Sequence, residues 1–223
     1  MNFQVNVREF LAEFIGTFAL VLAAAGGAAM VKDVSVLGAS LAPGLVLAVF
    51  IYAYGDLSGA HLNPAVTFGL AINKVVEWTE AVYYWVAQFL GSVVAASVLY
   101  FLFGASKTNL GATVLGKSLN PLQGVLIEAL LTFFLVTVVF HVAVAGKAQG
   151  VGGLVIGLTL TFGILLGFTA TGGSLNPART FGPAIYTGTF NVFWIYLVGP
   201  LLGAAGAAFL YRYMGTNTGL GMK

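Results

Sequence analysis

The chain has 223 residues, of which 59% are hydrophobic and only 7% are charged, and its formal net charge is +2. A soluble domain carries about 25% charged residues, so this composition predicts an integral membrane protein, and the small net charge gives no reason to expect a nucleic-acid partner. With no cysteine and two histidines, the sequence excludes a disulfide framework, a thiolate metal site, a cysteine nucleophile and a histidine-rich metal site.

Six apolar segments are each close to the roughly 20 residues that a helix needs to cross the hydrocarbon core. They are expected at about 8–30, 36–54, 80–103, 122–144, 151–168 and 192–213. The first could instead be a secretory signal peptide with Arg8 as its basic end. Because Glu13 lies inside its apolar part, the segment is predicted to be the first spanning helix.

Two further apolar pieces, at 64–72 and 177–186, are too short to span the membrane. An Asn-Pro-Ala tripeptide opens each of them, Asn63-Pro64-Ala65 and Asn176-Pro177-Ala178. Asn is a preferred helix N-cap and Pro is favoured at the first helical position. We therefore expect two half-helices that enter the membrane and stop; ordinary helical hairpins with Asn caps are the alternative.

The two halves of the sequence repeat each other. Glu13 and Glu128 are 115 residues apart, the two Asn-Pro-Ala tripeptides are 113 apart, and Tyr84 and Tyr196 are 112 apart. Each half has three spanning segments, an odd number, so the second half must enter the membrane from the opposite face. Such an inverted repeat places its functional site where discontinuous helices meet near the midplane.

A single channel domain is expected over 1–223, with one repeat at about 8–103, a loop at 104–120 and the second repeat at about 121–213. Small residues four apart are typical of close helix crossings. Two such pairs are expected to pack the halves together: Gly91 with Ala95, and Gly203 with Ala207.

Loop charges give the orientation. With six spans both termini lie on one face, and that face carries more basic residues than the other. The first set is Arg8, Lys74, Lys147, Arg212 and Lys223, and the second is Lys32, Lys107 and Lys117. The positive-inside rule then favours cytoplasmic termini.

A helix N-terminus carries about half a positive charge and unpaired backbone N–H groups. If the half-helices meet, Asn63 and Asn176 face each other across a lumen, their amides can donate to a passing oxygen, and the dipoles repel cations. Irregular backbone at this depth must line a cavity or be buried in protein. The loops before the half-helices are therefore predicted to line the pore: Gly59, Ala60, His61, Leu62, Gly172, Ser174 and Leu175.

The paired tripeptides, with Arg179 directly after the second and with Glu13 and Glu128 in the first helix of each half, resemble the aquaporin (major intrinsic protein) family over essentially all of 8–213. The resemblance implies an all-α integral membrane fold, a right-handed bundle of six transmembrane helices with two re-entrant half-helices. It also implies a homotetramer with one pore per subunit, and passive transport of water or small uncharged solutes without catalysis or a cofactor.

In that family four positions near the extracellular mouth form a selectivity constriction. Counting from the tripeptides places them at Pro43, Ile164, Gly173 and Arg179. Water-selective members usually have Phe and His at the first two positions, so the resemblance implies a wider and more apolar opening here. Ile, Gly and Arg are similar to archaeal and plant vacuolar-membrane members, associated with water, ammonia and urea. The glycerol branch normally has Asp where Thr180 stands.

Several of these residues have plainer interpretations. Pro43 could lie in the first turn of the second helix, where a missing N–H costs nothing, and Ile164 and Gly173 could be packing residues. Arg179 could be a surface arginine that reaches the interface, although an intramembrane charge is by default a functional hypothesis. As a pore residue it would donate to the permeant and repel protons and cations.

Glu13 and Glu128 are interpreted as structural acids rather than a catalytic pair, each accepting hydrogen bonds from backbone N–H groups of a re-entrant loop. His61 is expected to shape that loop or the cytoplasmic vestibule. No ion-coupling site, ion filter, nucleophile–base pair or metal cluster is recognisable in the sequence, which disfavours a secondary transporter, an ion channel and a membrane enzyme.

The sequence therefore predicts a passive channel for water and probable small neutral co-permeants, embedded in lipid as a multi-pass protein of a prokaryotic cell membrane. A facilitator mainly for ammonia, urea or glycerol is the alternative, and a non-conducting structural protein is a further one.

Overall fold

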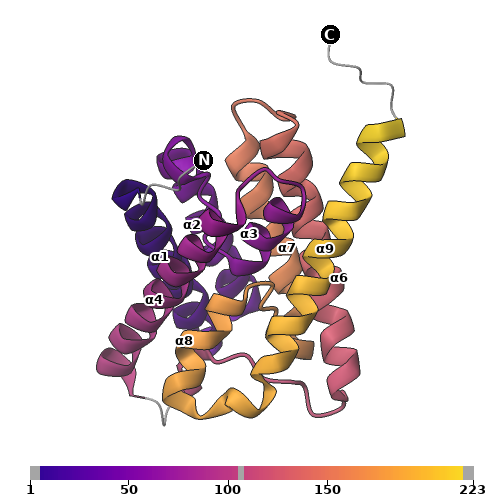
Figure 1. Ribbon diagram of the computed structural model, residues 1–223. Helices are drawn as coiled ribbons and strands as arrows, with labels where there is room; N and C mark the ends of the chain where they lie inside the picture. The colour runs from indigo at the N-terminus through magenta and orange to yellow at the C-terminus, as the bar shows by residue number, and fades with distance from the viewer. Residues whose placement is uncertain (1–5, 105–107, 218–223) are drawn as a thin grey trace.

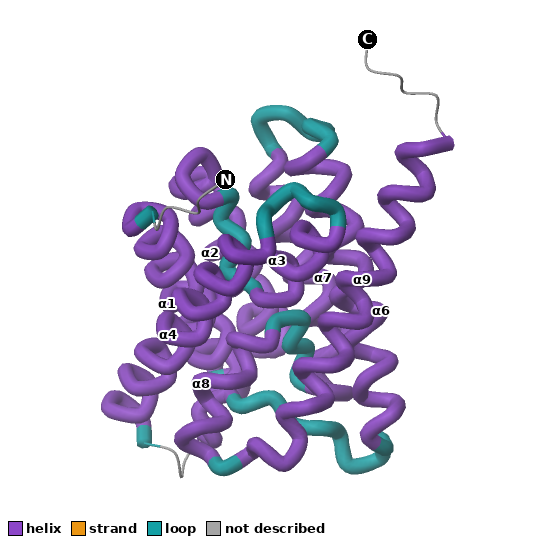
Figure 2. The backbone as a smooth tube through the Cα atoms, in the orientation of Figure 1, coloured by secondary structure: helices purple, strands orange, loops and turns teal. Residues whose placement is uncertain are grey.

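The computed structural model describes residues 6–104 and 108–217, and within these ranges it consists of helices and their connecting loops (Figures 1 and 2). Six helices are long and apolar enough to cross a membrane, which confirms the predicted fold class. They are α1 (Val7–Ala29), α2 (Val31–Ser58), α4 (Trp78–Phe103), α6 (Pro121–Val139) with its π-helical end η2 (Phe140–Val144), α7 (Gly152–Thr171) and α9 (Phe193–Asn217).

Two short helices complete the bundle, α3 (Pro64–Ile72) and α8 (Pro177–Thr187). They lie in opposite halves of the bundle, α3 toward the end where α1 begins and α9 ends, and α8 toward the other end (Figure 1). We call these ends the terminal face and the opposite face. The short 3₁₀ turns η1 (Asn109–Gly111) and η3 (Thr189–Val192) connect helices at the opposite face.

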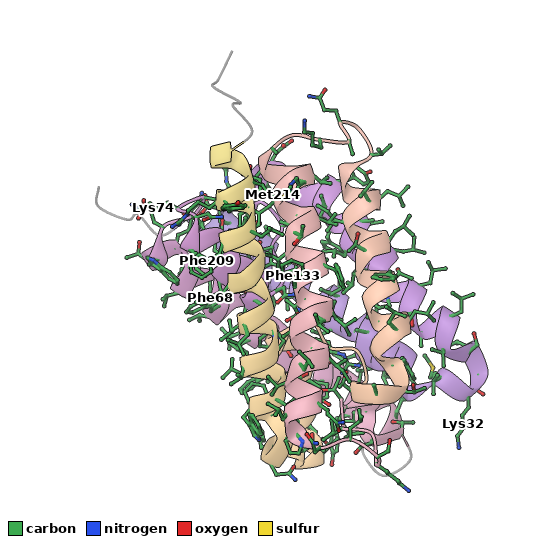
Figure 3. All side chains as sticks on the ribbon, turned by 90° about the vertical axis from the view of Figure 1, so that its right-hand side faces the viewer. Lys32, Phe68, Lys74, Phe133, Phe209 and Met214 are labelled. Atoms are coloured by element: carbon green, nitrogen blue, oxygen red, sulfur yellow. The ribbon has the colours of Figure 1, made fainter. Side chains whose placement is uncertain are left out.

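Charged and apolar side chains separate along the bundle axis. Lys74 lies toward the terminal face and Lys32 toward the opposite face, with Phe68, Phe133 and Phe209 between them (Figure 3). Many large apolar side chains between the two faces point outward, as lipid-facing residues do. Lys107 and Lys223, which were counted for the orientation, lie outside the described residues.

The second spanning helix is longer than expected and is interrupted near its start. Ser35 has φ 64° and ψ 166°, and its hydroxyl accepts a hydrogen bond from Gly38 N at 3.4 Å, so regular helix begins after it. Pro43 consequently lies in the interior of α2 and is buried. The alternative that Pro43 occupies the first turn is wrong, because the helix starts well before the apolar stretch that marked it.

The small-residue pairs pack helices within each half. A Cβ on Gly91 of α4 would lie 2.5 Å from Phe14 O of α1, and a Cβ on Gly203 of α9 would lie 2.1 Å from Ala129 O of α6. The prediction that these pairs join the two halves is therefore wrong. Small-residue spacing signals a close crossing but carries no information about which helix is crossed.

The halves meet instead through α2 and α7. A Cβ on Gly44 would lie 2.5 Å from Gly157 O, and a Cβ on Gly157 would lie 2.3 Å from Gly44 O. This reciprocal contact between residues 113 apart is what a two-fold axis between inverted repeats produces. Each half-helix also packs on a long helix of the other half, α8 on α4 and α3 on α9.

Gly157→Ala is expected to destabilise the folded protein, because the new methyl would press on the α2 backbone. Overpacking of this kind costs about 1–3 kcal/mol. The measurement is the Tm of the purified protein in detergent. The matched control is Gly206→Ala in α9, whose Cβ would lie 3.5 Å from the Phe133 ring, an ordinary contact. Equal Tm values for the two variants would contradict the importance of the α2–α7 contact.

Candidate pore where the half-helices meet

Both half-helices begin at an asparagine cap. Asn63 and Asn176 have extended backbones, and each is followed by Pro at the start of its helix. Asn63 Oδ1 accepts from Ala65 N at 2.9 Å. Asn176 Oδ1 accepts from Ala178 N at 2.9 Å and from Arg179 N at 3.2 Å. Because capping uses the side-chain oxygens, each residue presents its amide nitrogen away from its own helix.

These amide nitrogens connect the two halves. Asn63 Nδ2 donates to Leu175 O at 2.8 Å, and Asn176 Nδ2 donates to Leu62 O at 2.9 Å. The reciprocal bonds hold the N-termini of α3 and α8 against each other inside the bundle. An amide NH₂ has two hydrogens, so one hydrogen of each group is left for another acceptor.

A buried carboxylate holds each loop that leads into a half-helix. Glu13 of α1 accepts from Ser58 Oγ at 2.7 Å and from the backbone N–H groups of His61 and Leu62, both at 2.8 Å. Gln88 Nε2 donates to the same carboxylate at 2.8 Å. Four donors therefore converge on a fully buried acid that ties α1 and α4 to the first loop.

Glu128 of α6 holds the second loop in the same way. It accepts from Thr171 Oγ1 at 2.6 Å, from Ser174 N at 2.9 Å and from Leu175 N at 2.8 Å. Each donor stands 113 residues after its counterpart at Glu13. Leu62 and Leu175 both have left-handed backbones, with φ 50° and 54°. A charged acceptor for the loop N–H groups offsets the cost of such conformations.

The side chains of Leu62 and Leu175 do not line a pore. Both are fully buried. A Cβ on Gly16 of α1 would lie 2.4 Å from Leu62 Cδ2, and a Cβ on Gly163 of α7 would lie 2.7 Å from Leu175 Cδ2. The prediction that these leucines line the pore is corrected for their side chains, which anchor the loops against helices and leave only backbone to face inward.

A cavity of about 300 Å³ lies on the terminal side of the asparagine pair, and we call it the chamber. Of the predicted loop residues, Gly59, Ala60 and His61 line it, together with Asn63 and Asn176. Its other walls are almost entirely aliphatic: Leu20, Leu47, Ile51, Gly55, Val66, Leu70, Val75, Leu135, Val139, Ala143, Val144, Ile156 and Leu160. Gly172, Gly173 and Ser174 are not among the lining residues.

Arg179 lies on the other side of the asparagine pair, in the first turn of α8, with only 4% of its surface exposed. Its Nη1 donates to Gly111 O at 2.7 Å and its Nη2 to Ala24 O at 3.4 Å. The alternative of a surface arginine is wrong, because the guanidinium is enclosed. The remaining N–H groups of the fork are available to other acceptors.

The other constriction residues are partly brought together. Gly173 and Ile164 touch, since a Cβ on Gly173 would lie 2.8 Å from Ile164 Cα, and Ile164 retains 6% exposure. Pro43 is buried beside Gly44, where α2 contacts α7. None of the four constriction residues is among those that line the chamber.

The sequence analysis missed the loop that holds Arg179. Gly111 has φ 59°, and a Cβ there would lie 2.0 Å from Ala25 O. Nearby, Thr113 Oγ1 lies 2.8 Å from Thr180 Oγ1, which lies 2.7 Å from Ser174 Oγ. These residues belong to a connection with no counterpart in the repeat, so neither periodicity nor duplication could identify them.

Gly111→Ala is expected to weaken the seat of Arg179, because the methyl group would force the loop off α1 and move the carbonyl that Nη1 bonds. We expect faster proton leak through reconstituted protein, by roughly the 2- to 10-fold that one lost hydrogen bond represents. Gly104→Ala is the control, since Gly104 also has positive φ but an added Cβ meets nothing within 4 Å. The same leak in both variants would contradict this role.

Comparison with known proteins identifies relatives along the whole chain. The family model "Major intrinsic protein" matches residues 2–211. Glycerol uptake facilitator protein-like 6 of Lactiplantibacillus plantarum is 40% identical over 218 residues, which cover 95% of this chain and 100% of that protein. Aquaporin-5 of Ovis aries is 38% identical over 214 residues, covering 93% and 81%.

A plant protein and a solved structure extend the comparison. Aquaporin TIP2-1 of Arabidopsis thaliana is 36% identical over 226 residues, covering 95% of this chain and 90% of that protein. The X-ray structure of the aquaglyceroporin from Plasmodium falciparum superimposes with a TM-score of 0.82 at 30% identity, covering 92% of this chain and 95% of that one.

Proposed function

The chain belongs to the major intrinsic protein family, and on that basis we propose that it is a passive channel for water and other small uncharged solutes that excludes protons and ions. The observation that carries the proposal is the meeting of two half-helix N-termini at Asn63 and Asn176, beside an enclosed chamber. Two positive dipole ends inside a membrane protein disfavour a cation on the path while offering N–H donors to a neutral oxygen.

In this proposal each group has one task. The free amide hydrogens of Asn63 and Asn176 donate to the permeant, and Arg179 donates to it on the opposite side and repels cations. Ile164, Gly173 and Pro43 bound the constriction near Arg179. Glu13 and Glu128 support the loops and take no part in chemistry, so no reaction is catalysed.

The setting follows from the family and the charge pattern. We propose a single channel domain that assembles as a homotetramer with one pore per subunit, in a prokaryotic cell membrane with the terminal face in the cytoplasm. The larger number of basic residues expected on the terminal face supports this orientation.

A second candidate, a facilitator mainly for glycerol, urea or ammonia, is favoured by two observations. The chamber is wide and aliphatic, and small Ile164 and Gly173 stand where bulkier residues would narrow the mouth. The name of the Lactiplantibacillus plantarum relative also refers to glycerol uptake. Thr180 in place of Asp is a difference from the glycerol branch.

The experiment that tests both is stopped-flow light scattering on liposomes with purified protein, against protein-free liposomes. An impermeant osmolyte reports water flow, glycerol and urea report solute flow, and an internal pH dye reports ammonia entry. Fast water flow supports the channel. Fast solute entry with modest water flow supports the facilitator, and rates equal to protein-free liposomes for every solute contradict both.

A further inference from the structure

His61 differs chemically from the residue that takes its place in the second half of the channel. The repeat pairs His61 with Ser174 and Thr67 with Thr180, each 113 residues apart. Ser174 Oγ lies 2.7 Å from Thr180 Oγ1, and His61 Nδ1 lies 3.1 Å from Thr67 Oγ1. The same threonine contact is therefore made in both halves, but the imidazole has a second nitrogen, Nε2, that serine lacks.

The neighbours of Thr67 fix where the imidazole proton sits. The Glu13 carboxylate only accepts, so the Gln88 group that bonds it must be the NH₂, and this Nε2 also donates to Thr67 Oγ1 at 3.0 Å. Gln88 Oε1 is left buried without a partner among the described residues, which fits an amide orientation imposed by the acid.

Thr67 then has one hydrogen to give, and it donates that hydrogen to Asn63 O at 3.1 Å. Toward His61 it can only accept, so Nδ1 carries the ring hydrogen. In a neutral imidazole the other nitrogen is then a bare acceptor. The chain Glu13, Gln88, Thr67 thus selects the tautomer with an unprotonated Nε2.

Nε2 is presented to the chamber. His61 is a lining residue, and within the described ranges no group hydrogen-bonds to its Nε2. Glycine at position 59 leaves room for it, since a Cβ there would lie 2.9 Å from Nε2. The Tyr84 ring packs edge-on against the imidazole, with ring centroids 5.2 Å apart, and holds its orientation.

His61 is the one side-chain acceptor among the residues that line the chamber. The remaining walls are aliphatic or glycine, and the oxygens of Asn63 and Asn176 are used as helix caps. Liquid water takes about 30 Å³ per molecule, so a chamber of about 300 Å³ holds several waters that bond one another. A larger solute displaces those waters, and its N–H or O–H groups then depend on the wall.

We propose that His61 Nε2 binds the N–H or O–H donor of a small uncharged solute in the chamber, and that Thr67 and Gln88 are positioning residues that fix its tautomer. The site rests on the proposed channel function and specifies its solute class: neutral molecules such as urea or glycerol that carry a donor and fit against aliphatic walls. Water passes the same chamber with less dependence on His61.

The first test is His61→Ser, which installs the residue of the second half and so keeps a hydroxyl partner for Thr67 while removing Nε2. In liposomes we expect the urea:water and glycerol:water permeability ratios to fall about 2- to 10-fold, the range of one net hydrogen bond. His141→Ser is the control, because His141 lies outside the chamber with its Nδ1 2.9 Å from Thr137 O. An unchanged ratio in folded His61→Ser would overturn the proposal.

The second test reads the tautomer directly and does not depend on transport. Solid-state NMR of ¹⁵N-histidine-labelled protein in lipid, on the His141→Ser background, should show a protonated Nδ1 and a bare Nε2 for neutral His61. Thr67→Val should mix the tautomers and lower both ratios, and Thr67→Ser should preserve them. A protonated Nε2, or a Thr67→Val protein that behaves as wild type, would overturn the assignment.

The two tests separate failure of the inference from failure of the channel function. If wild-type liposomes pass water no faster than protein-free liposomes, the proposed function fails and the ratios carry no meaning. If wild type conducts and His61→Ser keeps its ratios, the function stands and the role of His61 is overturned.

Discussion

Glu13→Gln and Glu128→Gln are expected to abolish most of the folded protein. Each carboxylate accepts at least two backbone N–H groups of a loop that has no other acceptor for them. Gln of the same shape would turn an NH₂ group toward one of these donors. Hydrogen bonds to a charged group contribute about 1.5–3 kcal/mol each, so the loss is large against a total stability of about 5–15 kcal/mol.

The measurement is the yield of monodisperse protein after purification and its Tm. Glu13→Gln should be the more severe variant, because Glu13 also holds Ser58 and Gln88 whereas Glu128 additionally holds only Thr171. Glu77→Gln is the control, an exposed acid at the start of α4 that makes no capping hydrogen bond. Normal yield with altered solute selectivity would place the two acids in the permeation path instead.

Arg179→Val is expected to raise proton and cation leak strongly while water flow persists. The guanidinium is enclosed at the start of α8, on the path that the two half-helices define. A unit charge acts on another at 4 Å with about 4 kcal/mol at an effective dielectric constant of 20. Removing it should raise leak at least about tenfold, since the half-helix dipoles still contribute to the barrier.

The leak is measured as the decay of an imposed pH gradient in the same liposomes that report water flow. Arg8→Val is the control, because Arg8 is exposed in the first turn of α1. Unchanged leak in Arg179→Val, with normal water flow, would remove Arg179 from the barrier.

Most of the fold could be predicted because its signals are local. Hydropathy located the six spanning helices, and the Asn-Pro start located α3 and α8 to within a residue at either end. The start of α2 was missed because Val31 to Val34 form a helical turn before the break at Ser35. Gly91 and Gly203 showed that helices cross closely but not with which partner.

The candidate site divides along the same line. The duplication brought Asn63 and Asn176 into one hypothesis, but it gave no sign that each amide bonds the carbonyl before the other asparagine. Gly111 reaches Arg179 from a connection outside the repeat, and that contact depends on how the loop folds back on α1. Contacts of this kind are set by tertiary packing and leave no periodic trace in the sequence.

The central claim is that the chamber is the permeation path, and a single cysteine tests it most directly. The wild-type chain has no cysteine, so mercury should leave its water flow unchanged. Val139→Cys places a thiol of similar size on the chamber wall, and Val86→Cys places one on the outward face of α4, where Val86 is 49% exposed. Mercury should block water flow in liposomes with Val139→Cys, reversibly with added thiol, and leave Val86→Cys unaffected. Full water flow through Val139→Cys protein with mercury bound at position 139 would contradict the account.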